Sequence, residues 1–294
     1  MKIGMLALGL GHGTNPASIR EIVSKAESLG FSTLWAPEHV VVFDKYTSHY
    51  PYTQQGEFPL DPNGDLLDPF AVLAYAAACS SRIRLATGIC IVPERNPLIT
   101  AKEIATVDRL CGGRFMFGVG VGWSAEEYAA LGVPFERRGA RALEYIEVMR
   151  RIWREESTSF QGEFVRFERV KSYPKPAQGA NIPIVFGGES RPALRRVARA
   201  GNGWAGFDLT PEQAKVKIQE LEKLLKEYGR SISEVEIMVS PYGRGCSRDD
   251  LKRYADLGVS ELVVVPFALG LGDIGPAALV EAVARDYVEP AAAL

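Results

Sequence analysis

Residues 183–207, PIVFGGESRPALRRVARAGNGWAGF, contain the pattern that decides the fold. An apolar run at 183–187 ends in glycines, a helical pattern follows at 191–200, and a second apolar run occupies 203–207. Short aliphatic runs that alternate with helical segments are typical of consecutive βα units. Because the runs are continuously apolar, we expect parallel strands that are covered on both faces.

The same unit recurs eight times along the chain. We predict strands at 2–8, 33–37, 84–92, 114–120, 183–187, 203–207, 235–240 and 261–267. Helices are predicted at 19–29, 101–110, 139–155, 191–200, 211–228, 248–257 and 275–288, several with Ser, Thr or Asp near the start as caps. Eight units favour an α/β fold of the closed (β/α)8 TIM-barrel type, and one such barrel accommodates 294 residues. We therefore expect a single domain over residues 1–294.

Two stretches interrupt this alternation. Residues 40–67 are rich in Tyr, Pro and Gly and follow strand two, where a barrel places a lid over its active face. Residues 157–181 carry spaced Phe and Val residues and predict a small β-hairpin and linker. We expect insertions after strands two and four and before strand five.

Composition argues against several classes of protein. The chain has 34 basic and 36 acidic residues and no long basic run, which argues against a nucleic-acid partner. The cysteines stand singly at 79, 90, 111 and 246, without the spacing of a metal or redox site, so we expect no metal and a reducing cytoplasm. Apolar runs fall short of the roughly 20 residues that a spanning helix needs, which predicts no membrane segment.

The glycine cluster GLGHGT at 9–14 follows strand one. A dinucleotide-binding fold places its phosphate turn there, and Glu38 at the end of strand two would match the ribose acid. Thr14, however, stands where the third glycine belongs. A flexible first loop of a barrel explains the cluster as well.

Glu38 and His39 end strand two, the position from which barrel enzymes draw catalytic groups. Histidine is rare, with only His12, His39 and His49, and all three follow strands one and two. The pair indicates acid–base chemistry, although a capped strand end with a surface histidine has the same sequence.

Three glycine-containing segments indicate a ligand site. Gly88 interrupts strand three, and the sequence FGVGVGW at 117–123 reduces the end of strand four to backbone, which leaves space for a planar ring. After strand five, Ser190 caps a helix whose first turn offers N–H groups and a positive dipole to a phosphate. Tight turns and an ordinary capped helix are the alternatives.

Taken together, these motifs resemble the luciferase-like monooxygenase superfamily, and within it the branch that uses the deazaflavin coenzyme F420. The resemblance extends over nearly the whole chain. It rests on LGF at 29–31, WAPEH at 35–39, RIRLATG at 82–88, RNP at 95–97, DRL at 108–110, GR at 113–114, GVGVGW at 118–123, LGVPF at 131–135, RG at 138–139, GG at 187–188 and AGNGW at 200–204.

The resemblance implies roles for individual residues. The coenzyme ring would lie at the strand ends, over a non-proline cis peptide between Gly88 and Ile89. His39, with Glu38 beside it, matches the position that handles a proton near the site of hydride transfer. The residues that border the ring would be Gly120, Val121, Gly122 and Trp123, and those that take the phosphate through main-chain donors would be Gly187, Gly188, Glu189 and Ser190.

The implied reaction is hydride transfer between F420 and an unidentified small organic substrate, with His39 as proton donor or acceptor. Trp123 stands where sugar-phosphate-oxidising relatives carry an acid, so Glu126 or Glu127 is the alternative second acid. A rival is an FMN-dependent monooxygenase supplied with reduced flavin by a separate reductase. A non-catalytic flavin or deazaflavin binder is a third interpretation. The resemblance also implies a homodimer.

Overall fold

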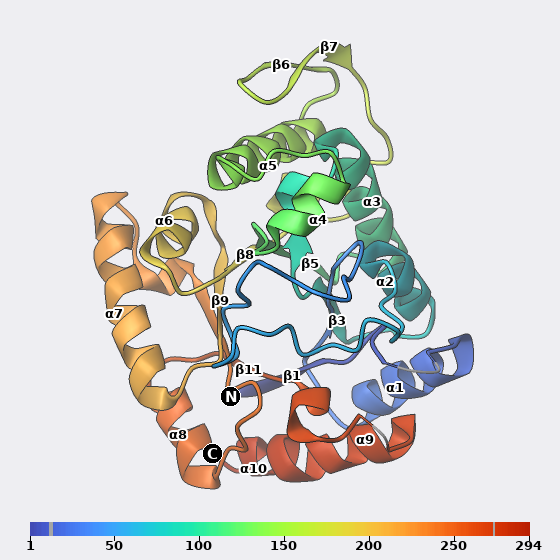
Figure 1. Ribbon diagram of the computed structural model, residues 1–294, viewed down its shortest axis with the longest axis vertical. Helices are drawn as coiled ribbons and strands as arrows, with labels where there is room; N and C mark the ends of the chain where they lie inside the picture. The colour runs from blue at the N-terminus through green and yellow to red at the C-terminus, as the bar shows by residue number, and fades with distance from the viewer. Residues whose placement is uncertain (12–13, 273) are drawn as a thin grey trace.

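The computed structural model describes residues 1–11, 14–272 and 274–294. In that part of the chain, parallel strands form a closed barrel with helices around the outside (Figure 1). Their order is β3-β2-β1-β11-β10-β9-β8-β5, and a β3–β5 pairing closes the ring. The strands are β1 (Lys2–Leu6), β2 (Thr33–Ala36), β3 (Arg84–Thr87), β5 (Phe115–Gly120), β8 (Ile184–Gly187), β9 (Gly203–Phe207), β10 (Glu236–Ser240) and β11 (Glu261–Val264). The predicted TIM barrel is confirmed, and the dinucleotide-fold alternative is wrong.

Two predicted strands differ from the structure by more than two residues, and the others agree to within two. The run at 84–92 is broken at Gly88 and Ile89, after which β4 (Cys90–Ile91) pairs again with β5. The last strand ends at Val264, not at residue 267, and a 3₁₀ turn, η4 (Pro266–Leu269), follows it. Pro266 has no N–H to donate to a strand partner, so the ladder stops before it.

The helices cover the outside of the barrel. They are α1 (Pro16–Ser28), α2 (Pro69–Ala78), α3 (Pro97–Leu110), α4 (Ala125–Ala130), α5 (Arg138–Arg154), α6 (Arg191–Ala200), α7 (Pro211–Glu227), α8 (Arg248–Asp256), α9 (Pro276–Val283) and α10 (Glu289–Ala292). A π turn, η5 (Ala284–Val288), joins the last two and interrupts the helix predicted at 275–288. The sequence did not predict α2 or α4. Helix α2 is apolar on nearly every face and so lacks an amphipathic period, and α4 spans only 6 residues.

The predicted hairpin is present ahead of β8. Its strands β6 (Thr158–Gln161) and β7 (Arg166–Val170) pair antiparallel and project beyond α5 (Figure 1). The Glu144 carboxylate of α5 accepts N–H groups of Phe164 and Val165 at 2.7 and 2.9 Å. The hairpin is therefore tied to the barrel through α5.

The inside of the barrel is filled by side chains. The residues that pack there are Leu6, Trp35, Ala86, Met116, Val185, Met238, Val263 and Val265. A larger apolar layer lies between the strands and the helices. At the amino ends of the strands, buried Glu261 accepts bonds from Thr33, Trp35 and Arg84, which closes that end of the barrel. Open space is left at the carboxyl ends.

Residues 40–67 cross the carboxyl end of the barrel (blue to cyan in Figure 1) as the predicted lid. In the glycine cluster at 9–14, His12 and Gly13 lie outside the described residues. No helix of the described chain combines the length and the apolar character needed to cross a membrane.

Candidate functional site

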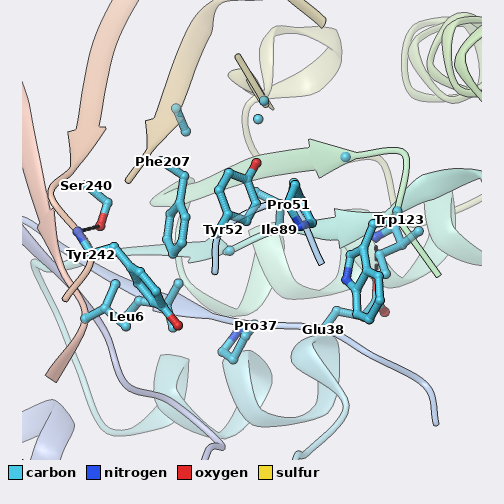
Figure 2. A pocket seen from close by; sticks show the side chains of 18 of the residues that line it. Leu6, Pro37, Glu38, Pro51, Tyr52, Ile89, Trp123, Phe207, Ser240 and Tyr242 are labelled. Carbon is cyan, nitrogen blue, oxygen red and sulfur yellow. Dashed lines mark hydrogen bonds between the residues drawn. The ribbon is translucent and has the colours of Figure 1, made fainter. Parts of the chain in front are cut away.

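A cavity of about 540 Å³ lies at the carboxyl ends of the strands, beneath the lid. Figure 2 shows Phe207 and Tyr242 toward one side, Trp123 toward the other, and Tyr52 and Ile89 between them. All the site residues assigned from the sequence line this cavity. They are Glu38, His39, Gly88, Ile89, Gly120, Val121, Gly122, Trp123, Gly187, Gly188, Glu189 and Ser190.

His39 follows β2 and is bonded to a carboxylate from another element. Its Nδ1 lies 2.7 Å from Oε2 of Glu127, which is 1% exposed in α4. The other oxygen of Glu127 accepts the N–H of Val40 at 2.7 Å. Because a carboxylate only accepts, Nδ1 carries the hydrogen and Nε2 is left to exchange a proton with a ligand. The arrangement is that of a general acid–base held in one tautomer.

Glu38, which is next to His39 in the sequence, bonds to the main chain and to Arg95. Its Oε2 accepts the N–H of Ile91 at 2.6 Å, and its Oε1 accepts Nε of Arg95 at 2.6 Å. Arg95 in turn reaches Asp68 at 2.7 Å. The Glu38 carboxylate is therefore used in holding the main chain just past the break in strand three, and Glu127 is the partner of His39.

Glu126, the other alternative acid, holds the lid. Its Oε1 accepts the N–H of Ser48 at 2.8 Å and that of Thr47. Burial alone would raise the pKa of this carboxyl, but the hydrogen bonds from Ser48 and Thr47 outweigh that effect and lower the pKa to about 2. Glu126 therefore stays ionised and fixes the lid, while its neighbour Glu127 orients the histidine.

The floor of the cavity is built from glycines packed against one side chain. The peptide between Gly88 and Ile89 is cis, as the resemblance implies. A Cβ added at Gly120 would lie 2.2 Å from Cδ1 of Ile89, and one added at Gly187 would lie 2.7 Å from the same atom. In the observed conformation of Ile89, a side chain at either position would displace the end of the Ile89 side chain. The floor is therefore formed by glycine main chain together with Ile89.

The start of α6 forms one edge of the cavity. Gly188 has φ +104, a conformation that side-chain-bearing residues rarely adopt, and Ser190 caps the helix by accepting the N–H of Ala193 at 3.3 Å. The side chain of Glu189 accepts the N–H of Phe207 at 2.7 Å. The main chain of this turn offers the positive end of a helix to an anion.

Aromatic side chains surround the space between floor and lid. Trp123 packs against Tyr46, Tyr50 and Phe58 of the lid, with ring centroids 4.9 to 5.3 Å apart. Its indole Nε1 is buried and has no hydrogen-bond partner among the described residues. Buried donors are almost always paired in native proteins, so this N–H is available to an acceptor on a ligand.

Glu94 lies just after β4, where no sequence motif indicated a functional residue. Both of its carboxyl oxygens are buried without a partner in the described chain. Burial, followed by the negative charges of Glu127 and Glu38, raises the pKa of Glu94 to about 9 despite the opposing charge of Arg95. The group is therefore a neutral acid at pH 7. The signal in the sequence is slight, because one Glu beside a proline in a short 3₁₀ turn, η1 (Val92–Glu94), reads as a surface residue.

A floor of glycines and Ile89, an unpaired indole N–H, a helix start and an oriented histidine fit a ligand that combines a planar polar ring with a phosphate. A cluster of three or more His, Cys, Asp or Glu side chains that could hold a metal ion was not found among the described residues.

Comparison with known proteins finds matches over most of the chain. The family model described as luciferase-like monooxygenase matches residues 1–251. An uncharacterised protein of Mycobacterium bovis is 36% identical over 270 residues, which are 90% of this chain and 91% of that protein.

Two solved structures show the same fold with different coenzymes in their descriptions. The coenzyme F420-dependent tetrahydromethanopterin reductase of Methanopyrus kandleri has a TM-score of 0.75 and 19% identity, over 98% of both chains. The FMN-bound oxygenating constituent of a Pseudomonas putida 3,6-diketocamphane monooxygenase has a TM-score of 0.63 and 18% identity, over 82% of this chain and 66% of that one. At such identities the likeness concerns the fold alone.

Proposed function

Since this chain belongs to the luciferase-like monooxygenase family, we propose that it is an F420-dependent oxidoreductase that transfers hydride to or from a small organic substrate. The single observation that supports this most is the His39–Glu127 pair, bonded at 2.7 Å, at the edge of a cavity whose floor and helix start suit a ring and a phosphate. We further propose that residues 1–294 act as one domain, because the lid and the hairpin are both bonded to the barrel.

The residues divide between holding the coenzyme and acting on the substrate. The ring would lie on Ile89 beside Gly120 and Trp123, and the phosphate would take the main-chain donors of 187–190. The indole N–H of Trp123 would meet an acceptor that the described chain does not supply. When bound, F420 supplies a carbon centre that gives or takes hydride in two-electron steps.

His39 would hold the proton that the substrate oxygen gains or loses. Glu127 keeps the hydrogen on Nδ1, so that Nε2 acts on the substrate, and it stabilises the imidazolium that forms when Nε2 takes a proton. The aromatic side chains of the lid exclude water from the cavity. They favour an apolar or aromatic substrate with one oxidisable or reducible oxygen function.

Titration of the purified protein with F420 and with FMN, followed by fluorescence, tests the choice of coenzyme. We expect micromolar affinity for F420 and weaker binding of FMN. Micromolar affinity for FMN alone would contradict the proposal.

The variant His39→Ala tests the chemical role. We expect it to keep its affinity for F420 and to lose about 10²- to 10⁴-fold in the rate of hydride exchange, the usual contribution of a positioned acid–base group. The matched control is His49→Ala, which removes a second histidine, from the lid, that lines the cavity. Equal rates in wild type and His39→Ala would contradict the role. If no substrate changes the coenzyme spectrum, the chain is a binder without turnover.

An FMN-dependent monooxygenase is the second candidate. The name of the family and the FMN-bound relative of similar fold favour it. Supplying FMN and a flavin reductase under air tests it, with oxygenated product as the readout. Product formation under these conditions would replace hydride transfer as the function.

A further inference from the structure

A second cavity, a cleft of about 600 Å³, adjoins the first at the start of α6. The two share Val121, Arg138, Ser190 and Arg196 in their linings. They therefore meet at the edge where the phosphate is proposed to lie. A ligand that enters the first cavity with its ring has this cleft as the next space beyond its phosphate.

The cleft is lined by cations. Five arginines line it, at 137, 138, 195, 196 and 199, and no acidic residue of the described chain does. Arg137 is neutralised, because its Nη2 donates to Glu163 at 2.8 Å. Arg195, Arg196 and Arg199 have no ion pair or hydrogen bond among the described residues. The cleft thus keeps several positive charges without a partner, and we name it the arginine cleft.

Two of these guanidinium groups lie together. Arg138 donates to the carbonyl of Gly122 at 3.3 Å and lies over the ring of Phe135 at 3.7 Å, which fixes it at the mouth of the cleft. Burial, and then the charge of Arg138, lower the pKa of Arg196. Two half-buried like charges repel each other, and an anion between them would remove that repulsion.

Arg199 lies in the last turn of α6, where the helix dipole favours a cation, but its spacing from Arg195 is unfavourable. Arg195 and Arg199 are four residues apart on α6, where like charges destabilise a helix. The segment RPALRRVARA contains four arginines and no acid. Cations gathered at such a cost, on the helix whose start adjoins the coenzyme cavity, indicate a ligand that carries several negative charges.

We propose that the arginine cleft binds an anionic tail of the coenzyme, a short chain of carboxylates that continues beyond the phosphate. The inference rests on the proposed function and deepens it. Deazaflavin F420 has such a tail of glutamate carboxylates after its phosphate, whereas FMN ends at the phosphate. The cleft therefore acts as a selector between the two coenzymes, because only the tailed one reaches Arg195 and Arg199.

The test compares two forms of the same coenzyme, F420 with its glutamate tail and the derivative cut back to the phosphate. Affinities for the full-length protein are measured by fluorescence. We expect truncation to weaken binding about tenfold in dilute buffer, which is the effect of one or two partly exposed ion pairs. Raising the salt to about 0.5 M shrinks the difference, because exposed charges are screened.

The double variant Arg195→Ala/Arg199→Ala should bind the tailed and truncated forms alike, with the affinity that wild type has for the truncated form. Its matched control is Lys215→Ala/Lys223→Ala, which removes two exposed cations from α7, outside both cavities. A tri-γ-glutamyl peptide should compete with the tailed form and leave the truncated form bound.

The outcomes separate the two proposals. Equal affinity of wild type for both forms overturns the arginine cleft as a tail site, as does an equal loss of both forms in the arginine variant. Failure of both forms to bind, or preference for FMN, overturns the proposed function and the cleft assignment with it.

Discussion

Ionisable side chains are buried at both ends of the barrel, but their hydrogen bonding differs between the two ends. At the amino end, the fully buried carboxylate of Glu261 accepts bonds from Ser32, Thr33, Trp35 and Arg84. Its partner Arg84 also bonds Glu236 at 3.1 Å, so both charges of the pair are compensated. This end of the barrel is a closed network.

At the carboxyl end, some polar groups are left without partners. Both oxygens of Glu94 and Nε1 of Trp123 are buried and unbonded among the described residues. Each such group costs free energy, so a stable fold keeps few of them. The comparison teaches that buried charge by itself does not mark a site. A buried group without a partner in the described chain does so where it also lines a cavity, as Trp123 does and the unpaired hydroxyl of Thr100 in α3 does not.

The largest effect is expected at the amino end. Arg84→Met leaves the Glu261 carboxylate buried with neutral donors only, and we expect the free energy of unfolding to fall by about 3 kcal/mol. Urea denaturation measures this, and coenzyme affinity should stay unchanged. A loss below about 1 kcal/mol would show that the network contributes little to stability.

At the carboxyl end, two neighbouring carboxylates of α4 should separate by function. Glu127→Gln removes the charge that orients His39, and we expect kcat to fall by about 10- to 100-fold with little change in KM. Glu126→Gln loosens the lid and should raise KM with a smaller change in kcat. Steady-state kinetics with the identified substrate measure kcat and KM for the two variants. The same changes of kcat and KM in both variants would contradict separate roles for the two carboxylates.

Glu94 should make stability depend on pH. Its pKa is about 9 in the folded chain and near the ordinary 4.5 when unfolded, so the unfolded state loses this proton first as pH rises. The stabilisation that comes from keeping Glu94 protonated in the folded chain is complete below pH 4.5. It is lost as the pH rises from about 4.5 to 9, so the free energy of unfolding falls over this range. We expect wild type to lose up to about 4 kcal/mol relative to Glu94→Gln between pH 5 and pH 8, since one proton of difference changes stability by about 1.4 kcal/mol per pH unit. Parallel pH profiles of the two proteins in urea would contradict this.

The smallest effect is expected in the lid. The pKa of Glu126 is lowered to about 2 from 4.5, so its bonds to the lid persist above pH 4.5 and weaken as pH falls toward 2. Amide exchange around residues 46–50 should therefore quicken a few-fold on acidification, beyond the intrinsic pH effect. Glu126→Gln should show the faster exchange already at pH 7. Equal exchange in variant and wild type would contradict the lid role.

Much of the fold was predictable because the strands and most helices have a local period. The eight strands follow from apolar runs, and α6 follows from a capping Ser190 and a regular apolar spacing. Helix α2 escaped prediction because its residues are apolar on nearly every face. The split of strand three at Gly88 was visible only as a glycine, which predicts a bulge without giving its geometry.

The sequence predicted residues that line the cavity, but it did not predict which of them are hydrogen-bonded to one another. Gly120 indicated space for a planar ring and Gly187 a phosphate-binding turn, and the structure shows that both glycines also accommodate the close approach of Ile89. The proximity of Glu38 and His39 in the sequence favoured that pair, but side chains that follow one another beyond a strand end need not meet. Glu94 escaped notice because its burial depends on neighbours from other elements.

By itself, the sequence determined the repeating βα units, the end of the barrel that carries the site, and the residue types gathered there. Only the tertiary structure decided which groups touch. His39 and Glu127 are 88 residues apart, and Arg138 and Arg196 come from different helices. Strand and helix periods depend on neighbours along the chain, whereas hydrogen bonds and charge pairs depend on closure of the barrel. The unpaired indole N–H of Trp123 and the unpaired side chains of Arg195, Arg196 and Arg199 become recognisable among the described residues only after that closure, and the proposed ligand site is built on them.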